Sequence, residues 1–214
     1  MRLSKPLFLL VDVLRTLCNH MSNVVGLTGG VGMGKTTVSG FLASRGCRVV
    51  DTDVIARSLT EPGTDGYLEV VACFGERVLD ERLRIDRGAL ANIVFSSEAK
   101  RRDLEHILHP RIRSAWKSQV SALRSVRGGA IFVVIPLLFE TGADKEFDQL
   151  LCVACSRATQ IQRLLARGWC LDHCVARANS QMPIDDKIRQ SDVVIWTDVP
   201  LRCLEQQCLK VFEI

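Results

Sequence analysis

No long uninterrupted apolar run occurs in the 214 residues, so the sequence predicts no membrane-spanning segment. The apolar stretch near the start, residues 6–11, is short and is soon interrupted by Asp12 and Arg15. It is not followed by the small-residue cleavage site that marks a secretory signal peptide. We therefore expect a cytoplasmic protein, in which residues 1–20 form a dispensable extension and Met21 is an alternative start.

A strong excess of charge of either sign is also missing. Lys and Arg number 28 against 24 Asp and Glu, which gives a formal net charge of +4, and the basic residues are spread along the chain. Such a weak, dispersed excess does not predict a nucleic-acid partner, and a small anionic substrate fits it equally well. Internal repeats and low-complexity tracts are likewise missing.

The nine cysteines lack the pattern of a metal site or a disulfide framework. Cys152 and Cys155 form a C-x-x-C pair, but no second pair has zinc spacing. The odd count and the chain length argue against a secreted disulfide scaffold. Because Cys152 lies in an apolar, strand-like run, we expect buried free thiols, with a metal or redox role as the alternative.

One stretch stands out against this ordinary composition. Residues 29–36 read Gly-Gly-Val-Gly-Met-Gly-Lys-Thr and match the phosphate-loop pattern G-x-x-x-x-G-K-S/T at every specified position. Residues 24–28 are typical of a short buried strand, residues 37–44 of a helix, and Gly46 of a helix end. This order favours a nucleotide site over a glycine-rich turn that binds nothing.

The residue types of the loop are those that hold a triphosphate. Glycines let successive N–H groups point into one concavity, and the following helix adds its positive dipole end. Lys35 supplies a cation for the β- and γ-phosphates. Thr36 supplies a hydroxyl ligand for Mg²⁺, and water would provide further ligands. We expect phosphate contacts from the loop residues Gly30, Val31, Gly32, Met33, Gly34, Lys35, Thr36 and Thr37.

Two acidic residues follow the next predicted strand, residues 47–50. The carboxyl ends of the strands in an open α/β sheet face the ligand crevice. Asp51 and Asp53 are two residues apart, so in extended geometry their side chains point the same way. They are suited to orient or deprotonate an acceptor hydroxyl, or to help hold the water shell of Mg²⁺. The alternative is that Asp53 only caps the following helix.

A helical insertion follows. Helix patterns fill residues 65–127: Asp86 caps one helix, Ser97 and Glu98 open another through Leu108, and Pro110 starts a third. A simple crossover does not need so many helical residues, and we interpret residues 61–127 as a substrate-binding lobe. His109 lies at the central junction, where a structural role is the alternative to a functional one.

The remaining residues predict three more strands, at 130–135, 149–154 and 192–195, and a closing helix at 201–212. The resulting fold class is α/β: a three-layer P-loop fold with a parallel five-stranded sheet and helices on both faces. We expect a core of residues 21–60, 128–160 and 184–214, together with the inserted lobe and a lid at 161–183.

The lid carries basic residues. Arg163 and Arg167 share one face of a predicted helix, and Arg177 and Lys187 follow. On a mobile flap these cations would neutralise charge on a transferred group, although a solvated basic face is the alternative. Where a Walker B acid is expected, the chain has Pro136, so Glu140 and the aspartate pair are the carboxylates available near Mg²⁺.

Together the motifs resemble the dephospho-coenzyme A kinase family over residues 24–212. The phosphate loop is shared by many families, but the other motifs are more particular. They are Asp51-Thr52-Asp53-Val54-Ile55-Ala56-Arg57, Leu108-His109-Pro110-Arg111-Ile112, Pro136-Leu137-Leu138-Phe139-Glu140, and Arg177 with Gln181-Met182-Pro183 and Lys187. The family's last strand usually continues into Asp-Asn with a Gly soon after, whereas this chain has Trp196-Thr197-Asp198-Val199. The resemblance therefore does not carry over any adenine or ribose contact made by that Asn.

The resemblance implies that ATP phosphorylates the 3′-hydroxyl of the ribose of dephospho-coenzyme A, with Mg²⁺ present. The catalytic residues it implies are Lys35, Asp53 as the general base, and Arg163. The substrate contacts it implies come from Asp51, Asp53, Arg57, His109 and Leu137.

Two other functions stay open from the residues. One is another small P-loop kinase that acts on a nucleoside or nucleotide, and the other is a P-loop ATPase that serves as a switch or assembly factor. A GTPase switch is disfavoured, because neither N-K-x-D nor D-x-x-G occurs. We expect a small-molecule substrate, no membrane partner, and a monomer or weak homo-oligomer.

Overall fold

The structure is a computed structural model that describes residues 23–125 and 129–212. The predicted extension, residues 1–20, lies outside the described residues. The chain divides into two compact units. We call Met1–Val50 together with Leu123–Ile214 the core unit and Asp51–Ala122 the helical unit, and we describe each by itself.

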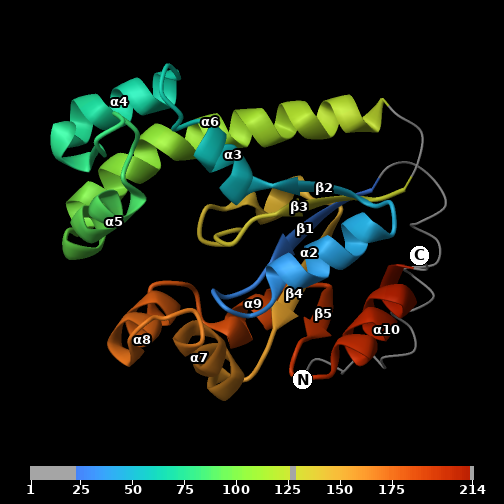
Figure 1. Cartoon of the computed structure of the whole chain (residues 1–214). Coiled ribbons are helices and arrows are strands. Elements are labelled where there is room, and N and C mark those ends of the chain that lie inside the picture. Colours follow the sequence, from blue (N-terminus) through green and yellow to red (C-terminus); the bar gives the residue numbers. More distant parts are fainter. Residues whose placement is uncertain (1–22, 126–128, 213–214) are drawn as a thin grey trace, which may run out of the picture. The chain divides into compact units, whose positions relative to one another are not determined.

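A five-stranded sheet forms the centre of the core unit, with the strand order β2-β3-β1-β4-β5 (Figure 1). The pairs β1–β3, β1–β4 and β4–β5 are parallel. Each predicted strand is present with its ends shifted by at most one residue, which confirms the predicted sheet. The strands are β1 (Val24–Thr28), β2 (Arg48–Asp51), β3 (Ile131–Val134), β4 (Gln149–Ala154) and β5 (Val193–Trp196).

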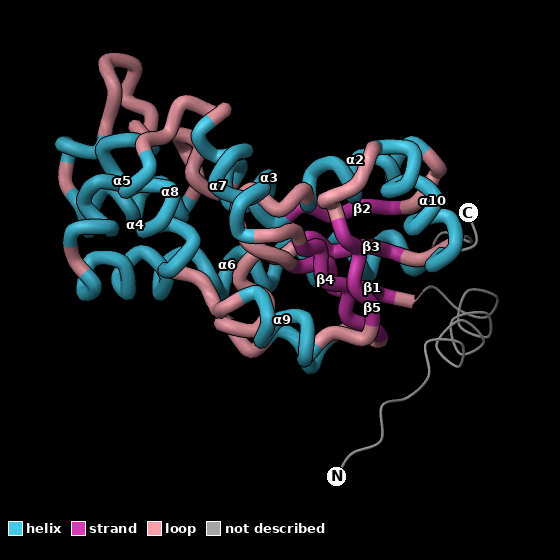
Figure 2. The backbone as a smooth tube through the Cα atoms, turned by 90° about the horizontal axis from the view of Figure 1, so that it is seen from below, coloured by secondary structure: helices cyan, strands magenta, loops and turns pink. Residues whose placement is uncertain are grey.

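Helices cover both faces of this sheet, as predicted. On one face Val25 and Leu27 pack in a core cluster with residues of α2 (Lys35–Ser44) and α10 (Leu201–Phe212), because alternate strand residues point to the same side. Figure 2 shows α9 (Ile184–Gln190), which packs against β4, across the strands from α2.

The face of β1 opposite this cluster is packed tightly at Gly26. A Cβ at this position would lie 2.7 Å from Leu138 Cδ1 and 2.9 Å from the Phe147 ring. The missing side chain therefore makes room for the connection between β3 and β4, which includes the short helix η2 (Ala143–Glu146).

A helical hairpin follows β4. Its helices, α7 (Arg157–Leu165) and α8 (Leu171–Asn179), pack against each other. Ser156 caps α7, and its own N–H donates to the Asp198 carboxylate at 2.5 Å. Hydrogen bonds from Thr159 and from this N–H hold the pKa of Asp198 below its usual value. The base of the hairpin is thus tied to the segment that follows β5.

The helical unit has its own small core. Its helices are α3 (Thr52–Ser58), α4 (Asp65–Phe74), η1 (Glu76–Val78), α5 (Arg87–Ser96) and most of α6 (Glu98–Arg124). The buried cluster consists of Val70, Phe74, Val78, Leu90 and Val94. The predicted cap is confirmed, because the Asp86 carboxylate accepts the N–H groups of Gly88 and Ala89.

The prediction that Pro110 starts a new helix is wrong. α6 runs without a break from Glu98 to Arg124 with Pro110 in its interior, although proline removes a backbone donor and crowds the preceding turn. The Arg111 guanidinium donates to Ile107 O at 2.8 Å within the turn that precedes it. Buried Trp116 and Val120 supply packing farther along the helix.

The eight described cysteines are free thiols, as expected. Cys152 and Cys155 are buried, and burial raises the pKa of Cys152 to about 11, so that its thiol is protonated at neutral pH. Cys170, by contrast, is exposed. Among the described residues, no group of three or more His, Cys, Asp or Glu side chains could hold a metal ion. Within the same residues, no helix has the length and apolar character needed to cross a membrane.

Candidate nucleotide site

The predicted phosphate loop links β1 to α2, in the order that the sequence indicated. Gly32 and Gly34 have positive φ angles of 75° and 95°, a backbone conformation that favours glycine. The turn closes through a hydrogen bond of 3.2 Å from Met33 N–H to Gly30 O. Since α2 begins at Lys35, the loop leads into a helix N-terminus, a geometry that binds anions.

Lys35 lies back over this loop. Its Nζ donates to Gly29 O at 2.8 Å and to Gly30 O at 2.9 Å. The ammonium is therefore held at the mouth of the loop, where it can interact with a phosphate. Thr36 and Thr37, the next two residues of α2, are exposed and available to a ligand.

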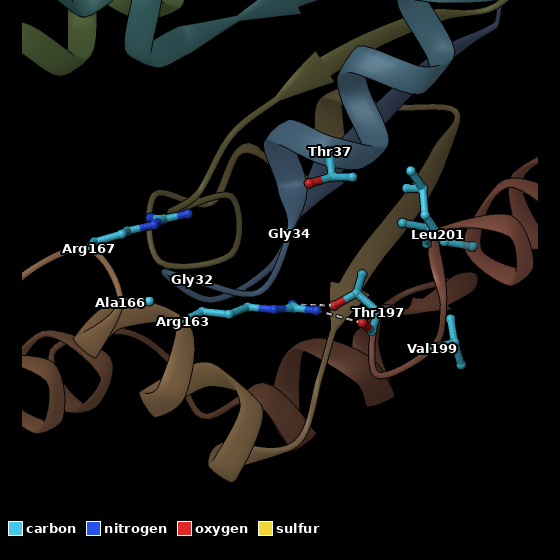
Figure 3. Close-up of a pocket in the computed structure, with 10 residues that line it drawn as sticks. Gly32, Gly34, Thr37, Arg163, Ala166, Arg167, Thr197, Val199 and Leu201 are labelled. Atoms are coloured by element: carbon cyan, nitrogen blue, oxygen red, sulfur yellow. Dashed lines mark hydrogen bonds between the residues drawn. The ribbon is translucent and has the colours of Figure 1, made fainter.

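A pocket of about 370 Å³ adjoins the loop. Figure 3 shows the side chains of α7 on one side of it and those after β5 on the other. The lining combines arginines with apolar side chains, a chemistry suited to a flat aromatic ring that carries anionic groups. The lining residues are Gly32, Gly34, Thr37, Arg163, Ala166, Arg167, Thr197, Val199, Leu201 and Leu204.

Thr197 joins the two sides of this pocket. The Arg163 guanidinium donates to Thr197 Oγ1 at 2.7 Å and to Thr197 O at 2.6 Å (Figure 3). The Thr197 hydroxyl in turn donates to Met33 O in the phosphate loop at 3.0 Å. With only 3% of its surface exposed, Thr197 is a fixed connection between Arg163 and the loop. Thr197 stands in the stretch that departs from the Asp-Asn pattern of the family, and its hydroxyl bonds both Arg163 and Met33 O.

Lys187 is not a flap cation, contrary to the prediction. This residue of α9 has a fully buried side chain, whose Nζ donates to Pro136 O at 2.7 Å and lies 2.9 Å from Glu140 Oε1. The same carboxylate accepts the Met182 N–H at 2.9 Å. Glu140, predicted as a carboxylate available near Mg²⁺, instead ties Met182 and Lys187 to the connection after β3.

The acidic pair lies in the helical unit, and its geometry differs from the extended one predicted. α3 already begins at Thr52, and Asp51 is its N-cap, with Oδ1 accepting the Asp53 N–H at 2.8 Å. The expectation that Asp53 could be the cap is therefore wrong. Asp53 is exposed in the first turn of α3, and its carboxylate is not the cap.

The other predicted substrate residues are divided between the units. Arg57 is exposed in the last turn of α3, and half-buried His109 lies in the middle of α6, so both belong to the helical unit. Leu137 belongs to the core unit, in the connection after β3, where its carbonyl accepts the Thr141 hydroxyl at 2.8 Å. Among the predicted residues, Arg163 and the phosphate loop come together in the core unit.

Sequence reasoning missed two glutamines that contact the loop. Gln160 donates to Val31 O at 2.8 Å, and Gln181 accepts the Val31 N–H at 2.7 Å. Gln181 belongs to the motif Gln181-Met182-Pro183, but the sequence did not indicate a role for its side chain. Gln160 gave no local signal, because a glutamine in a helix is ordinarily exposed, whereas this one is only 2% exposed.

Comparison with known proteins shows the family to which the chain belongs. The family model described as dephospho-CoA kinase matches residues 23–201. A dephospho-CoA kinase from Listeria innocua serovar 6a is 36% identical over 194 residues, which cover 90% of this chain and 97% of the relative. One from Geobacillus kaustophilus is 39% identical over 178 residues, which cover 82% and 88% of the two chains.

Solved structures give the same result. The dephospho-CoA kinase from Campylobacter jejuni superposes with a TM-score of 0.67 at 27% identity, covering 90% of this chain and 96% of that one. Shikimate kinase from Acinetobacter baumannii, at 16% identity and a TM-score of 0.55, covers 92% and 96% of the two chains and shows the fold alone. Because the family model matches most of the chain and the Listeria and Geobacillus relatives are 36% and 39% identical to it, the chain belongs to the dephospho-CoA kinase family.

Proposed function

We propose that this kinase transfers the γ-phosphoryl group of ATP to the 3′-hydroxyl of the ribose of dephospho-coenzyme A, giving coenzyme A and ADP. Membership of the family supports the reaction. The observation that carries the proposal is the phosphate loop, whose positive-φ glycines and helix N-terminus form an anion-binding concavity beside a pocket that fits a nucleoside. The enzyme would act in the cytoplasm on a small molecule, as a monomer or weak homo-oligomer.

The loop and its lysine would bind the polyphosphate. Loop N–H groups other than those of Val31, Met33 and Thr37, which already have acceptors in the protein, would donate to phosphate oxygens. The Lys35 ammonium would move from the loop carbonyls to the β- and γ-phosphates. Positioning and charge stabilisation supply most of the acceleration in phosphoryl transfer, since the protein forms no covalent bond.

The pocket beside the loop would hold the nucleoside. Arg163 and Arg167 border it on one side, while Val199 and Leu201 border it on the other. A guanidinium group stacks well on an aromatic base, a role that we assign to Arg167, because the Arg163 guanidinium is held by Thr197. We assign Arg163 to the charge that develops during transfer, and residues 161–183 to the lid that carries it.

Thr36 would hold Mg²⁺, with water completing the coordination sphere. Its exposed position in the first turn of α2 fits this role, because an octahedral oxygen site is normally completed by phosphates and water. When bound, the ion would supply positive charge that offsets the negative charge of the phosphates. The chain's own residues would provide the rest of the site.

The acceptor would be held by the lobe at residues 61–127 together with Asp51, Asp53, Arg57, His109 and Leu137. Asp53 is the general base of the proposal: its exposed carboxylate accepts the proton of the 3′-hydroxyl as the phosphoryl group arrives. Asp51 is engaged as the helix cap and would hold α3 in place beneath it.

A valine at Thr197 should raise the KM for ATP by about tenfold, because the oriented arginine and the loop both lose their hydroxyl contact. Thr197→Val keeps the shape of the side chain, so the fold should persist. Thr197→Ser retains the hydroxyl and should remain within about twofold of the native KM. Equal KM values for all three proteins would show that the hydroxyl has no part in nucleotide binding.

An acceptor panel tests the function itself. ADP release, measured by a coupled assay, should depend on dephospho-coenzyme A and be at least about a hundredfold slower with AMP, CMP or shikimate, since specificity rests on contacts that those acceptors lack. ADP release at the same rate without any acceptor would indicate an ATPase. Preference for a nucleotide acceptor would instead indicate another small kinase.

A further inference from the structure

The peptide group of Val31 is held from both ends by side-chain amides. Its N–H donates to Gln181 Oε1 at 2.7 Å, and its carbonyl accepts from Gln160 Nε2 at 2.8 Å. The two glutamines use opposite ends of their amides, as the polarity of a peptide group requires. Val31 lies in the middle of the phosphate loop, so both bonds act on the element that grips the triphosphate.

Each glutamine is itself fixed. Gln160 is 2% exposed, and its Oε1 accepts from Arg157 Nη1 at 2.8 Å. The same guanidinium donates to Asn179 Oδ1 at 3.1 Å, which joins the first turn of α7 to the last turn of α8. Gln181 precedes Met182, whose N–H is bound by Glu140. Neither amide is therefore a loose surface group that meets the loop by chance.

The two glutamines also stand at the two ends of one structural element. Gln160 lies in α7, and Gln181 follows α8 by two residues, so they bracket the α7–α8 hairpin at its base. We infer that Gln160 and Gln181 are positioning residues which clamp the phosphate loop through Val31 and couple its geometry to the hairpin that carries Arg163. This inference rests on the proposed function for its kinetic consequences.

The clamp would act before ATP arrives. An open glycine-rich loop can adopt several backbone conformations, and only those with the N–H groups turned inward bind phosphate. When a fraction of the molecules is competent, the apparent dissociation constant rises as that fraction falls. Once bound, the triphosphate itself holds the loop. Loss of the clamp should therefore weaken ATP binding and leave turnover at saturating ATP nearly unchanged.

Methionine substitutions test this inference, because methionine matches glutamine in length but neither donates nor accepts strongly. Gln160→Met and Gln181→Met should each raise the KM for ATP by about tenfold, with kcat and the KM for dephospho-coenzyme A within about twofold of native values. In the double variant the KM for ATP should rise by less than the product of the two single increases, since both substitutions act on one peptide group. Gln162→Met, on the exposed face of α7, is the matched control and should match the native enzyme.

Hydrogen exchange gives a readout that requires no acceptor and no measurement of activity. In the nucleotide-free native protein the Val31 N–H should be protected by at least about tenfold over an unstructured amide, and Gln181→Met should remove that protection. Native KM values for ATP in both methionine variants, or an unprotected Val31 N–H in the native protein, would overturn the clamp. A protected Val31 in a protein that leaves dephospho-coenzyme A unmodified would instead refute the proposed function and leave the clamp standing.

Discussion

Replacing Asp53 with asparagine should lower turnover by at least about two orders of magnitude, the usual contribution of a general base, while the affinity for ATP changes little. The amide keeps the size of the side chain but cannot take up the proton of the attacking hydroxyl. Steady-state kinetics with dephospho-coenzyme A and a separate ATP titration measure the two quantities.

Asp65→Asn is the matched control for this change. Asp53 and Asp65 are both exposed acids in the first turn of a helix whose cap is another residue, Asp51 for α3 and Thr64 for α4. Both substitutions remove a favourable interaction with a helix dipole, which costs about 0.3–1 kcal/mol of stability. Only the first should impair turnover. If Asp53→Asn retains a turnover within about threefold of native, Asp53 is not the base.

Alanine at Gly29 should disrupt the site through the backbone. The residue has a φ of 146°, and a Cβ there would lie 2.2 Å from Val153 O, a backbone atom of the neighbouring strand β4. Overpacking and an unfavourable conformation together should destabilise the protein by about 3 kcal/mol or more. We expect the melting temperature to fall by about 10 °C and ATP binding to be lost with the loop geometry.

Gly40→Ala provides the contrast. Gly40 lies within α2, and a Cβ there would have no atom within 4 Å. Since alanine is a better helix former than glycine by about 1 kcal/mol, this variant should melt at or above the native temperature. Thermal unfolding of both variants, with and without ATP, makes the comparison. A Gly29→Ala protein that has the native melting temperature and is stabilised by ATP would contradict the close packing described at Gly29.

The parts of the molecule that could be predicted are those with local signatures. Eight consecutive residues specify the phosphate loop, and the strands followed from short apolar runs, so both were found close to their true bounds. The contacts that complete the site are not local: Val31 meets Gln160 and Gln181 across 129 and 150 positions, and Met33 meets Thr197 across 164. Such pairings depend on the assembled sheet, which no short pattern encodes.

The wrong predictions also have physical causes. Proline favours the first turn of a helix because it has a local cost in the helix interior, and packing along α6 outweighs that cost at Pro110. Lys187 was placed with the mobile cations because a lysine is rarely buried, yet a carboxylate and a carbonyl compensate its charge. Asp51 and Asp53 were treated as extended, whereas the helix begins between them.

The destination of the γ-phosphoryl group tests the central claim most directly. With ATP labelled in its γ-phosphate and dephospho-coenzyme A as the acceptor, the label should be recovered in coenzyme A, on the 3′-hydroxyl of the ribose, in an amount equal to the ADP formed. Label released as inorganic phosphate, or attached at any other position of the acceptor, would contradict the assignment of this site.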